Sequence, residues 1–78
     1  MKTTNYFEDQ VLRKRSYLRR AYCERVLDNP VYMEMQPDGR MRYYGFIAEL
    51  DTYLRVVTLE DGETIHNALV DRAFDLRL

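Results

Sequence analysis

The chain is poor in the residues on which catalytic and metal sites usually depend. Its 78 residues include one cysteine, Cys23, one histidine, His66, and no tryptophan. A single cysteine excludes an internal disulfide, and no second cysteine or histidine provides the ligand spacing of a structural zinc site. The sequence also has no glycine-rich phosphate loop and no GxSxG motif. We therefore expect neither a metal nor a cofactor.

Long hydrophobic runs are absent as well. No apolar segment approaches the roughly 20 residues that a membrane-spanning helix needs, and the N-terminal residues 1–9 have no apolar signal core. We therefore expect a cytoplasmic protein with no membrane partner. Three glycines and two prolines leave no room for a long linker, so residues 1–78 are expected to form a single domain. So short a chain buries only about 60% of its unfolded surface, which would favour a homodimer.

Two tripeptides that end in glycine divide the second half of the chain, Pro37-Asp38-Gly39 and Glu60-Asp61-Gly62. Each lies between runs rich in Val, Ile, Tyr, Met and Thr, which favour strands. Each is typical of a three-residue hairpin loop, with glycine at the position that needs a positive φ. The segments 31–36, 40–47, 53–59 and 63–68 are therefore predicted to form an antiparallel meander.

The loop lengths also predict the strand register. In the first hairpin the predicted pairs are Tyr32 with Tyr44, Met33 with Tyr43, Glu34 with Arg42, and Met35 with Met41. In the second hairpin they are Arg55 with Asn67, Val56 with His66, and Val57 with Ile65. A one-residue slip in the first hairpin would mix its apolar and polar faces, so that register is well specified. Beyond the last strand, the tail is expected to fold back so that Phe74 covers a sheet edge.

The first half of the chain has helical periodicity. Apolar residues recur at three- and four-residue intervals over 5–15 and over 18–28, with a break at Ser16-Tyr17 and an end at Asp28-Asn29-Pro30. Neither helix is long enough to be stable alone. The predicted fold is therefore α+β, with two short helices packed on a four-stranded antiparallel sheet. Which sheet face they cover depends on the connection 48–52 and stays open.

Positive charge is concentrated in the helical half. Residues 1–27 carry seven Lys/Arg against three acids, whereas residues 28–78 carry five Arg against ten acids. Such a division suits a protein that meets a polyanion with one surface, although it would equally let the two halves attract each other. The densest basic group surrounds Tyr17 and is a candidate surface for a nucleic acid or a protein partner. It consists of Arg13, Lys14, Arg15, Arg19 and Arg20.

A second candidate surface is the mixed face of the first hairpin. Arg42 alternates there with aromatic residues, and small RNA-binding sheets hold a strand on such a face. Its aromatic members are Tyr32, Tyr44 and Phe46. A half-solvated face or a dimer contact would look the same in the sequence. His66 is a candidate general acid or base, because its ordinary pKa lies near neutrality.

Four stretches of the chain together form a recognisable pattern: Val11-Leu12-Arg13-Lys14-Arg15-x-Tyr17-Leu18, Cys23-Glu24-x-Val26-Leu27-x-Asn29-Pro30-Val31, Pro37-Asp38-Gly39-Arg40, and Tyr53-Leu54-Arg55-Val56-Val57-Thr58-Leu59-x-Asp61-Gly62-x-Thr64-x-His66-Asn67-Ala68. This pattern resembles a group of small uncharacterised bacterial proteins that look allied to the BrnT-like branch of the RelE/ParE toxin superfamily. The resemblance covers residues 6–74.

This resemblance implies a compact RelE-like α+β domain. Ribosome-dependent members of the superfamily cut mRNA without a metal, using basic and aromatic side chains of the sheet, and members are commonly neutralised by an antitoxin. By residue type, the matching catalytic residues here are Arg42, Tyr44, Arg55 and His66. The chain departs from related small domains in having no histidine near its first helix.

Three functions are compatible with these features. The first is a small interaction domain that binds RNA or a protein. The second is a metal-independent ribonuclease toxin that acts on RNA or the ribosome and is held by an antitoxin-like protein. The third is a self-associating structural domain in which Tyr32, Tyr44 and Phe46 are buried between two copies.

Overall fold

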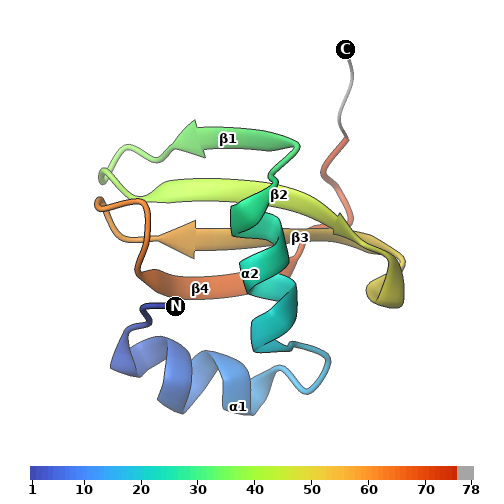
Figure 1. The fold of residues 1–78 in the computed structure, drawn as a ribbon, viewed down its shortest axis with the longest axis horizontal. Helices are drawn as coiled ribbons and strands as arrows, with labels where there is room; N and C mark the ends of the chain where they lie inside the picture. Colours follow the sequence, from blue (N-terminus) through green and yellow to red (C-terminus); the bar gives the residue numbers. More distant parts are fainter. Residues whose placement is uncertain (76–78) are drawn as a thin grey trace.

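The computed structural model describes residues 1–75 and shows an α+β fold with two short helices on one face of a four-stranded antiparallel sheet (Figure 1). The strands follow one another in space in the order of the chain, β1-β2-β3-β4. They span Tyr32–Met35 (β1), Met41–Ile47 (β2), Thr52–Thr58 (β3) and Ile65–Val70 (β4). The predicted fold class is confirmed.

The two helices lie close to their predicted positions. The first begins with a π-helical turn, Phe7–Val11, and continues as α1, Leu12–Lys14. The second helix, α2, spans Arg20–Asp28, two residues shorter than predicted, because Arg19 is extended at φ −127° and ψ 143°. Asn29 ends α2 immediately before Pro30, as the steric restriction on a residue before proline requires.

The helices pack on the face that carries Gly45, Ile47, Leu54 and Val56, and this settles which face is covered. Phe7, Ile47, Leu54 and Val56 are all fully buried in one core. Val26 of α2 lies directly over Gly45, where an added Cβ would come within 3.0 Å of Val26 Cγ2. Because side chains alternate along a strand, the neighbours Arg42, Tyr44 and Arg55 must point to the opposite face.

The first hairpin has the predicted register. Tyr32 pairs with Tyr44, Met33 with Tyr43, Glu34 with Arg42, and Met35 with Met41. Gly39 has φ +90°, and the Gln36 N–H donates to the Arg40 carbonyl at 2.7 Å. The three-residue loop is therefore confirmed.

The second hairpin differs from the prediction by two successive shifts. Its loop is one residue longer, because the Leu59 N–H donates to the carbonyl of Thr64 while Asp61 accepts hydrogen bonds from the N–H groups of residues 63 and 64. A bulge then adds His66 to β4, since Thr58 pairs with Ile65 but Val57 pairs with Asn67.

The predicted partners in this hairpin are therefore wrong. Val57 lies opposite Asn67 instead of Ile65, Val56 opposite Ala68 instead of His66, and Arg55 opposite Leu69 instead of Asn67. The strand β4 accordingly occupies Ile65–Val70 instead of 63–68.

The N-terminal half of the chain covers one edge of the sheet and leaves the other exposed. At the β4 edge, Thr3 forms a parallel bridge with Ile65, the first helix lies alongside (Figure 1), and the Val70 N–H donates to Tyr17 Oη at 3.3 Å. At the β1 edge, Met33 and Met35 remain 54% and 70% exposed. The N-terminal segment thus protects only one edge.

The close approach of α2 to β2 is testable. Gly45→Ala should destabilise the fold by about 1–3 kcal/mol, because the new methyl group overpacks against Val26. Denaturant unfolding would measure the loss. In a Val26→Ala background the same substitution should cost much less, which would appear as a coupling energy in the double-mutant cycle. Equal costs in both backgrounds would contradict this packing.

Candidate nucleic-acid interface

The sheet face away from the helices, termed the open face, carries arginines from β2 and β3 and aromatic side chains from β1, β2 and β3. Alternation and register place on it the residues Tyr32, Glu34, Arg42, Tyr44, Phe46, Tyr53, Arg55, Val57, Asn67 and Leu69. Four of the predicted site residues from the first hairpin, Tyr32, Arg42, Tyr44 and Phe46, share this face with Arg55.

A pocket of about 290 Å³ opens on this face. Arg40, Arg55, His66 and Asn67 line it, together with Tyr6 from the first helix. His66 reaches this pocket because the loop is one residue longer than predicted: Ile65 now pairs with Thr58 of the buried face, so the next side chain, His66, points to the open face. The bulge then places Asn67 opposite Val57 on the same face, as bulges beside functional sites commonly redirect a side chain.

The arginines of the open face have carboxylate partners, but the pairing is loose. Arg55 Nε lies 3.7 Å from Asp71, and Arg40 Nη1 lies 3.8 Å from Asp38. Charge-assisted hydrogen bonds are usually about 2.7–2.9 Å long. Within the part of the chain that the structure describes, the buried Nε of Arg55 makes no hydrogen bond at all.

Arg42 is held more firmly than the other two. Its guanidinium donates to Gln36 Oε1 at 3.0 Å and to Glu34 Oε1 at 3.2 Å. Gln36 also lines the pocket, so Arg42 borders the pocket without lining it. The pairs of Arg42 with Glu34 and of Arg40 with Asp38 are one third to one half exposed, and such ion pairs contribute only about 0–1 kcal/mol each. A phosphate group could therefore replace either carboxylate.

Partial burial, and then the positive charge of Arg40, lower the pKa of His66 below its ordinary value. Both effects favour the neutral imidazole at pH 7. The ring stacks on Tyr6 with centroids 4.8 Å apart, and Nδ1 lies 3.0 Å from the Thr4 hydroxyl. The Thr4 oxygen also accepts the Phe7 N–H at 3.1 Å, so the N-terminal segment fixes the imidazole ring.

Tyr44 lies beneath other aromatic rings. It is only 4% exposed, because Phe74 stacks on it at 4.2 Å with an interplanar angle of 11°. Phe74 therefore covers the open face rather than a sheet edge, which corrects the prediction for the tail. Burial raises the pKa of the Tyr44 phenol, so Tyr44 stays protonated at neutral pH and is unsuited to act as a base.

The other two aromatic residues of the predicted surface remain accessible. Tyr32 is 43% and Phe46 49% exposed. In the self-association hypothesis, they would be buried with Tyr44 between two copies. The chain itself already covers Tyr44, so only Tyr32 and Phe46 offer new area to a partner.

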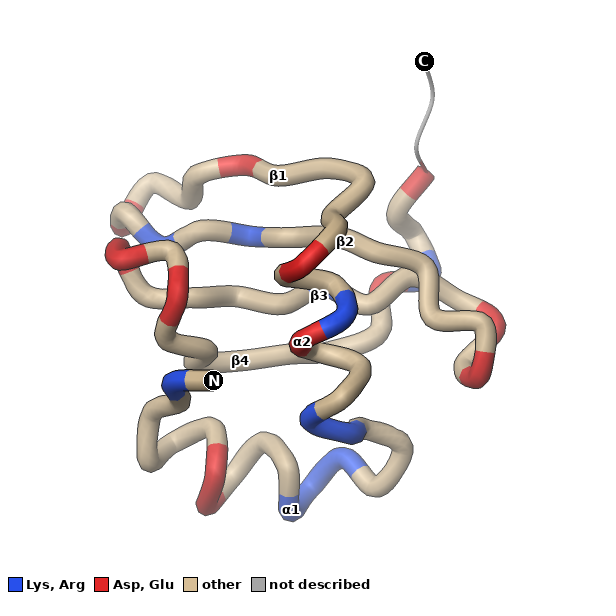
Figure 2. The backbone as a smooth tube through the Cα atoms, in the orientation of Figure 1, with Lys and Arg blue, Asp and Glu red and all other residues tan. Residues whose placement is uncertain are grey.

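The basic residues that are dense in the sequence lie at the end of the first helix and at the start of α2 (Figure 2), and their side chains have different surroundings. Arg20 forms a two-pronged ion pair with Glu8, whereas Arg13, Lys14 and Arg19 are exposed. Arg15 instead reaches the open face, where its Nη1 donates to Asn67 Oδ1 at 3.3 Å. The predicted helical cluster therefore contributes mainly Arg15 to this face.

Lys14 and Arg15 line a second, neighbouring pocket. Tyr6 belongs to both pockets. A basic path therefore leads from the end of the first helix past Tyr6 to His66 and Arg40.

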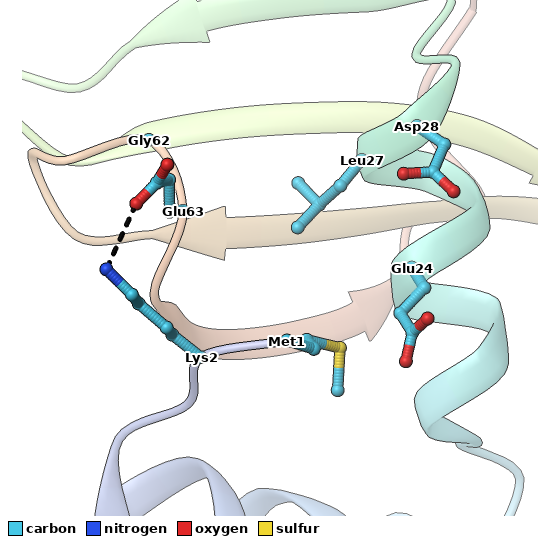
Figure 3. Close-up of a pocket in the computed structure, with 7 residues that line it drawn as sticks. All are labelled: Met1, Lys2, Glu24, Leu27, Asp28, Gly62 and Glu63. Carbon is cyan, nitrogen blue, oxygen red and sulfur yellow. Dashed lines mark hydrogen bonds and ion pairs between the residues drawn. The ribbon is translucent and has the colours of Figure 1, made fainter.

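Another pocket lies on the opposite side of the molecule, between α2, the N-terminus and the β3–β4 loop (Figure 3). It has a volume of about 490 Å³, and its lining includes three acidic residues, Glu24, Asp28 and Glu63, together with Lys2. Lys2 already pairs with Glu63 at 3.3 Å. The remaining negative charge would repel phosphate, so this pocket does not suit a polyanion.

Cys23 takes no part in either surface. It belongs to α2 and is fully buried in the core, and burial raises the pKa of its thiol to about 12. A thiol with such a pKa is a poor nucleophile. Among residues 1–75, no three His, Cys, Asp or Glu side chains cluster in a way that could hold a metal ion.

Four basic or aromatic residues on or beside the open face are not among the predicted site residues: Tyr6, Arg40, Tyr53 and Phe74. Strand alternation could have found two of them, because Arg40 precedes Arg42 by two positions and Tyr53 precedes Arg55 by two. Tyr6 and Phe74 reach the face through the chain termini, and no local sequence signal indicates this.

Comparison with protein-family models gives no match for the chain, and no curated protein and no solved structure is significantly similar to it. Across residues 1–75, no helix combines the length and apolar character that crossing a membrane requires. The open face is therefore the feature of the molecule that indicates a function.

The lowered pKa of His66 has a consequence for stability. Below about pH 6.5 the unfolded chain binds a proton at His66 more readily than the folded protein does. The free energy of unfolding should therefore decrease as the pH falls from 7 to 5. His66→Asn should remove the contribution of the histidine to this decrease in the free energy of unfolding. The carboxylates Glu8, Glu49 and Asp61, whose pKa values are lowered, affect the free energy of unfolding only at lower pH.

Urea unfolding of both proteins at several pH values between 5 and 7 would measure the difference. Parallel stability curves in this range would contradict a lowered histidine pKa.

Proposed function

We propose that this protein is a small module that binds single-stranded RNA on its open face. One observation carries the proposal: Arg15, Arg40, Arg42 and Arg55, which come from the first helix and from two strands, converge on one sheet face that also carries four aromatic rings of the strands. Arginines bind phosphates, and exposed aromatic rings stack on unpaired bases.

The shape of the surface favours a single strand. The face is a nearly continuous four-stranded sheet with shallow pockets, and bases that are splayed out can lie flat on it. The arginine pairs at 3.7 Å and 3.8 Å leave guanidinium N–H donors that a phosphate would satisfy better than the present carboxylates do. A duplex would offer its backbone but would keep its bases away from Tyr32 and Phe46.

The order of elements, two helices followed by a four-stranded meander, is also the order that a RelE-like ancestry implies. We include this ancestry in the proposal, since it would account for a small sheet with arginines and aromatic residues on one uncovered face.

Salt dependence tests the binding function. Binding of a 12-nucleotide single-stranded RNA should weaken with salt, with a slope in log K against log salt of about −2 to −3 if three or four phosphates are contacted. Arg40→Gln and Arg55→Gln should each reduce the slope by about 0.7. Fluorescence anisotropy at several salt concentrations would measure it.

Arg25→Gln is the matched control. It removes the same charge from an arginine of α2, on the helix side of the molecule, that also pairs with a carboxylate, Glu49. Binding that does not depend on salt, or an equal loss in this control, would refute an interface on the open face.

A second candidate function, a metal-independent ribonuclease, is favoured by the pocket that His66 shares with Arg40 and Arg55. Neutral His66 would take the proton of a ribose 2′-hydroxyl as its oxygen attacks the adjacent phosphorus. The arginines would neutralise the charge that develops on the phosphate, and the 5′-oxygen would leave with a proton from water. This role needs the tautomer in which Nδ1–H donates to Thr4, so that Nε2 accepts the proton.

His66→Asn separates the two candidates, since asparagine can keep the bond to Thr4 but cannot accept the proton. If the protein cleaves RNA, alone or on ribosomes, the variant should lose about 10²–10⁴-fold in rate and should still bind RNA. Gel analysis of cleavage products and growth arrest on expression would both report this. Absence of cleavage by the unmodified protein under both conditions would exclude the ribonuclease.

A further inference from the structure

The segment after β4 crosses the open face. The N–H of Asp71 donates to the Tyr53 carbonyl at 2.9 Å, which ties the start of the tail to β3. A turn follows, in which the Asp71 side chain accepts the Ala73 N–H at 3.1 Å and its carbonyl accepts the Phe74 N–H at 3.3 Å. This turn aims Phe74 back at the sheet.

The Phe74 ring lies where a base would stack. It is parallel to Tyr44 at 4.2 Å, meets Tyr53 edge-on at 5.0 Å, and lies 5.9 Å from Tyr32. Nucleobases adopt this same flat stacking on aromatic side chains. Tyr44 can therefore stack on a base only when Phe74 has moved away.

The Asp71 carboxylate lies where a phosphate would bind. Its Oδ2 is 3.7 Å from Arg55 Nε, within the range of an ion pair but beyond that of a hydrogen bond. The Arg55 Nε remains buried and unsatisfied within residues 1–75. A phosphate oxygen could approach this nitrogen more closely than the carboxylate does, because it is not constrained by the tail.

From these contacts, and resting on the RNA-binding function proposed above, we infer that Asp71 and Phe74 occupy a nucleotide subsite of the open face. Phe74 takes the place of a base on Tyr44, and Asp71 takes the place of a phosphate on Arg55. A single-stranded RNA that enters the subsite displaces the tail, and the tail therefore lowers the affinity of the protein for RNA.

The double variant Asp71→Asn/Phe74→Ala tests this subsite. It should bind an eight-nucleotide oligouridylate about two- to tenfold more tightly than the unmodified protein, because the RNA no longer has to displace a stacked aromatic pair. Glu63→Gln, which removes one negative charge at the distant Lys2 pair, should change the affinity less than twofold. Phe74→Tyr, which keeps a stacking ring, should resemble the unmodified protein.

Nuclear magnetic resonance of the unmodified protein gives an independent readout that does not depend on the folding of a variant. The Phe74 ring protons, shifted by stacking on Tyr44, should move toward unstacked values when the RNA is added.

Failure of the RNA-binding function and failure of the subsite would give different experimental results. If neither the unmodified protein nor the double variant binds the RNA, both the proposed function and the subsite are overturned. If both bind with equal affinity, or if the Phe74 resonances stay in place while RNA binds, the RNA-binding function stands and the subsite is overturned. Weaker binding by the double variant would also overturn the subsite, since Phe74 would then contact the RNA.

Discussion

The close packing of α2 on Gly45 determines how the two faces of the sheet are used. Only a residue without a side chain lets Val26 lie directly on the backbone of β2, and this contact assigns the face of Gly45 to the core. Strand alternation then leaves Arg42, Tyr44 and Arg55 no place except the opposite face. The chemistry of the open face therefore follows from a packing constraint on the buried face.

The first hairpin could be predicted almost completely, because everything that specifies it is local. Gly39 ends a loop whose length sets the register, and the Glu34–Arg42 pair and the methionines agree with that register. The second hairpin could not, because its register depends on interactions with other parts of the chain. The backbone of residues 2–4 pairs with Ile65, and Thr4 and Tyr6 hold the imidazole of His66. These contacts support a bulge that the sequence of the hairpin does not encode by itself.

The same distinction applies to the candidate site. The basic group around Tyr17 is dense in the sequence. Within residues 1–75, however, Arg20 forms an ion pair with Glu8, and Arg15 is the member that donates a hydrogen bond to a side chain of the sheet. The arginines that do gather, at positions 40, 42 and 55, are brought together by strand pairing. Charged residues that are adjacent in a short helix point in different directions around its axis, so their closeness in the sequence does not predict a shared surface. In paired strands every second side chain lies on the same face, so the sequence predicts much better which residues share a surface.

A face with several arginines and aromatic rings poses a problem for a chain of 78 residues. Such a small domain has little stability to spare, and an uncovered face of this kind gains nothing from burial and repels its own charges. The structure reduces both costs with groups from the same chain: carboxylates lie at 3.2–3.8 Å from three arginines, and Phe74 covers Tyr44. Because these contacts are long or partly exposed, each is weak enough for a phosphate or a base to replace it. The weak contacts of the carboxylates and of Phe74 thus stabilise the face when no ligand is bound, and a bound ligand would replace these same contacts.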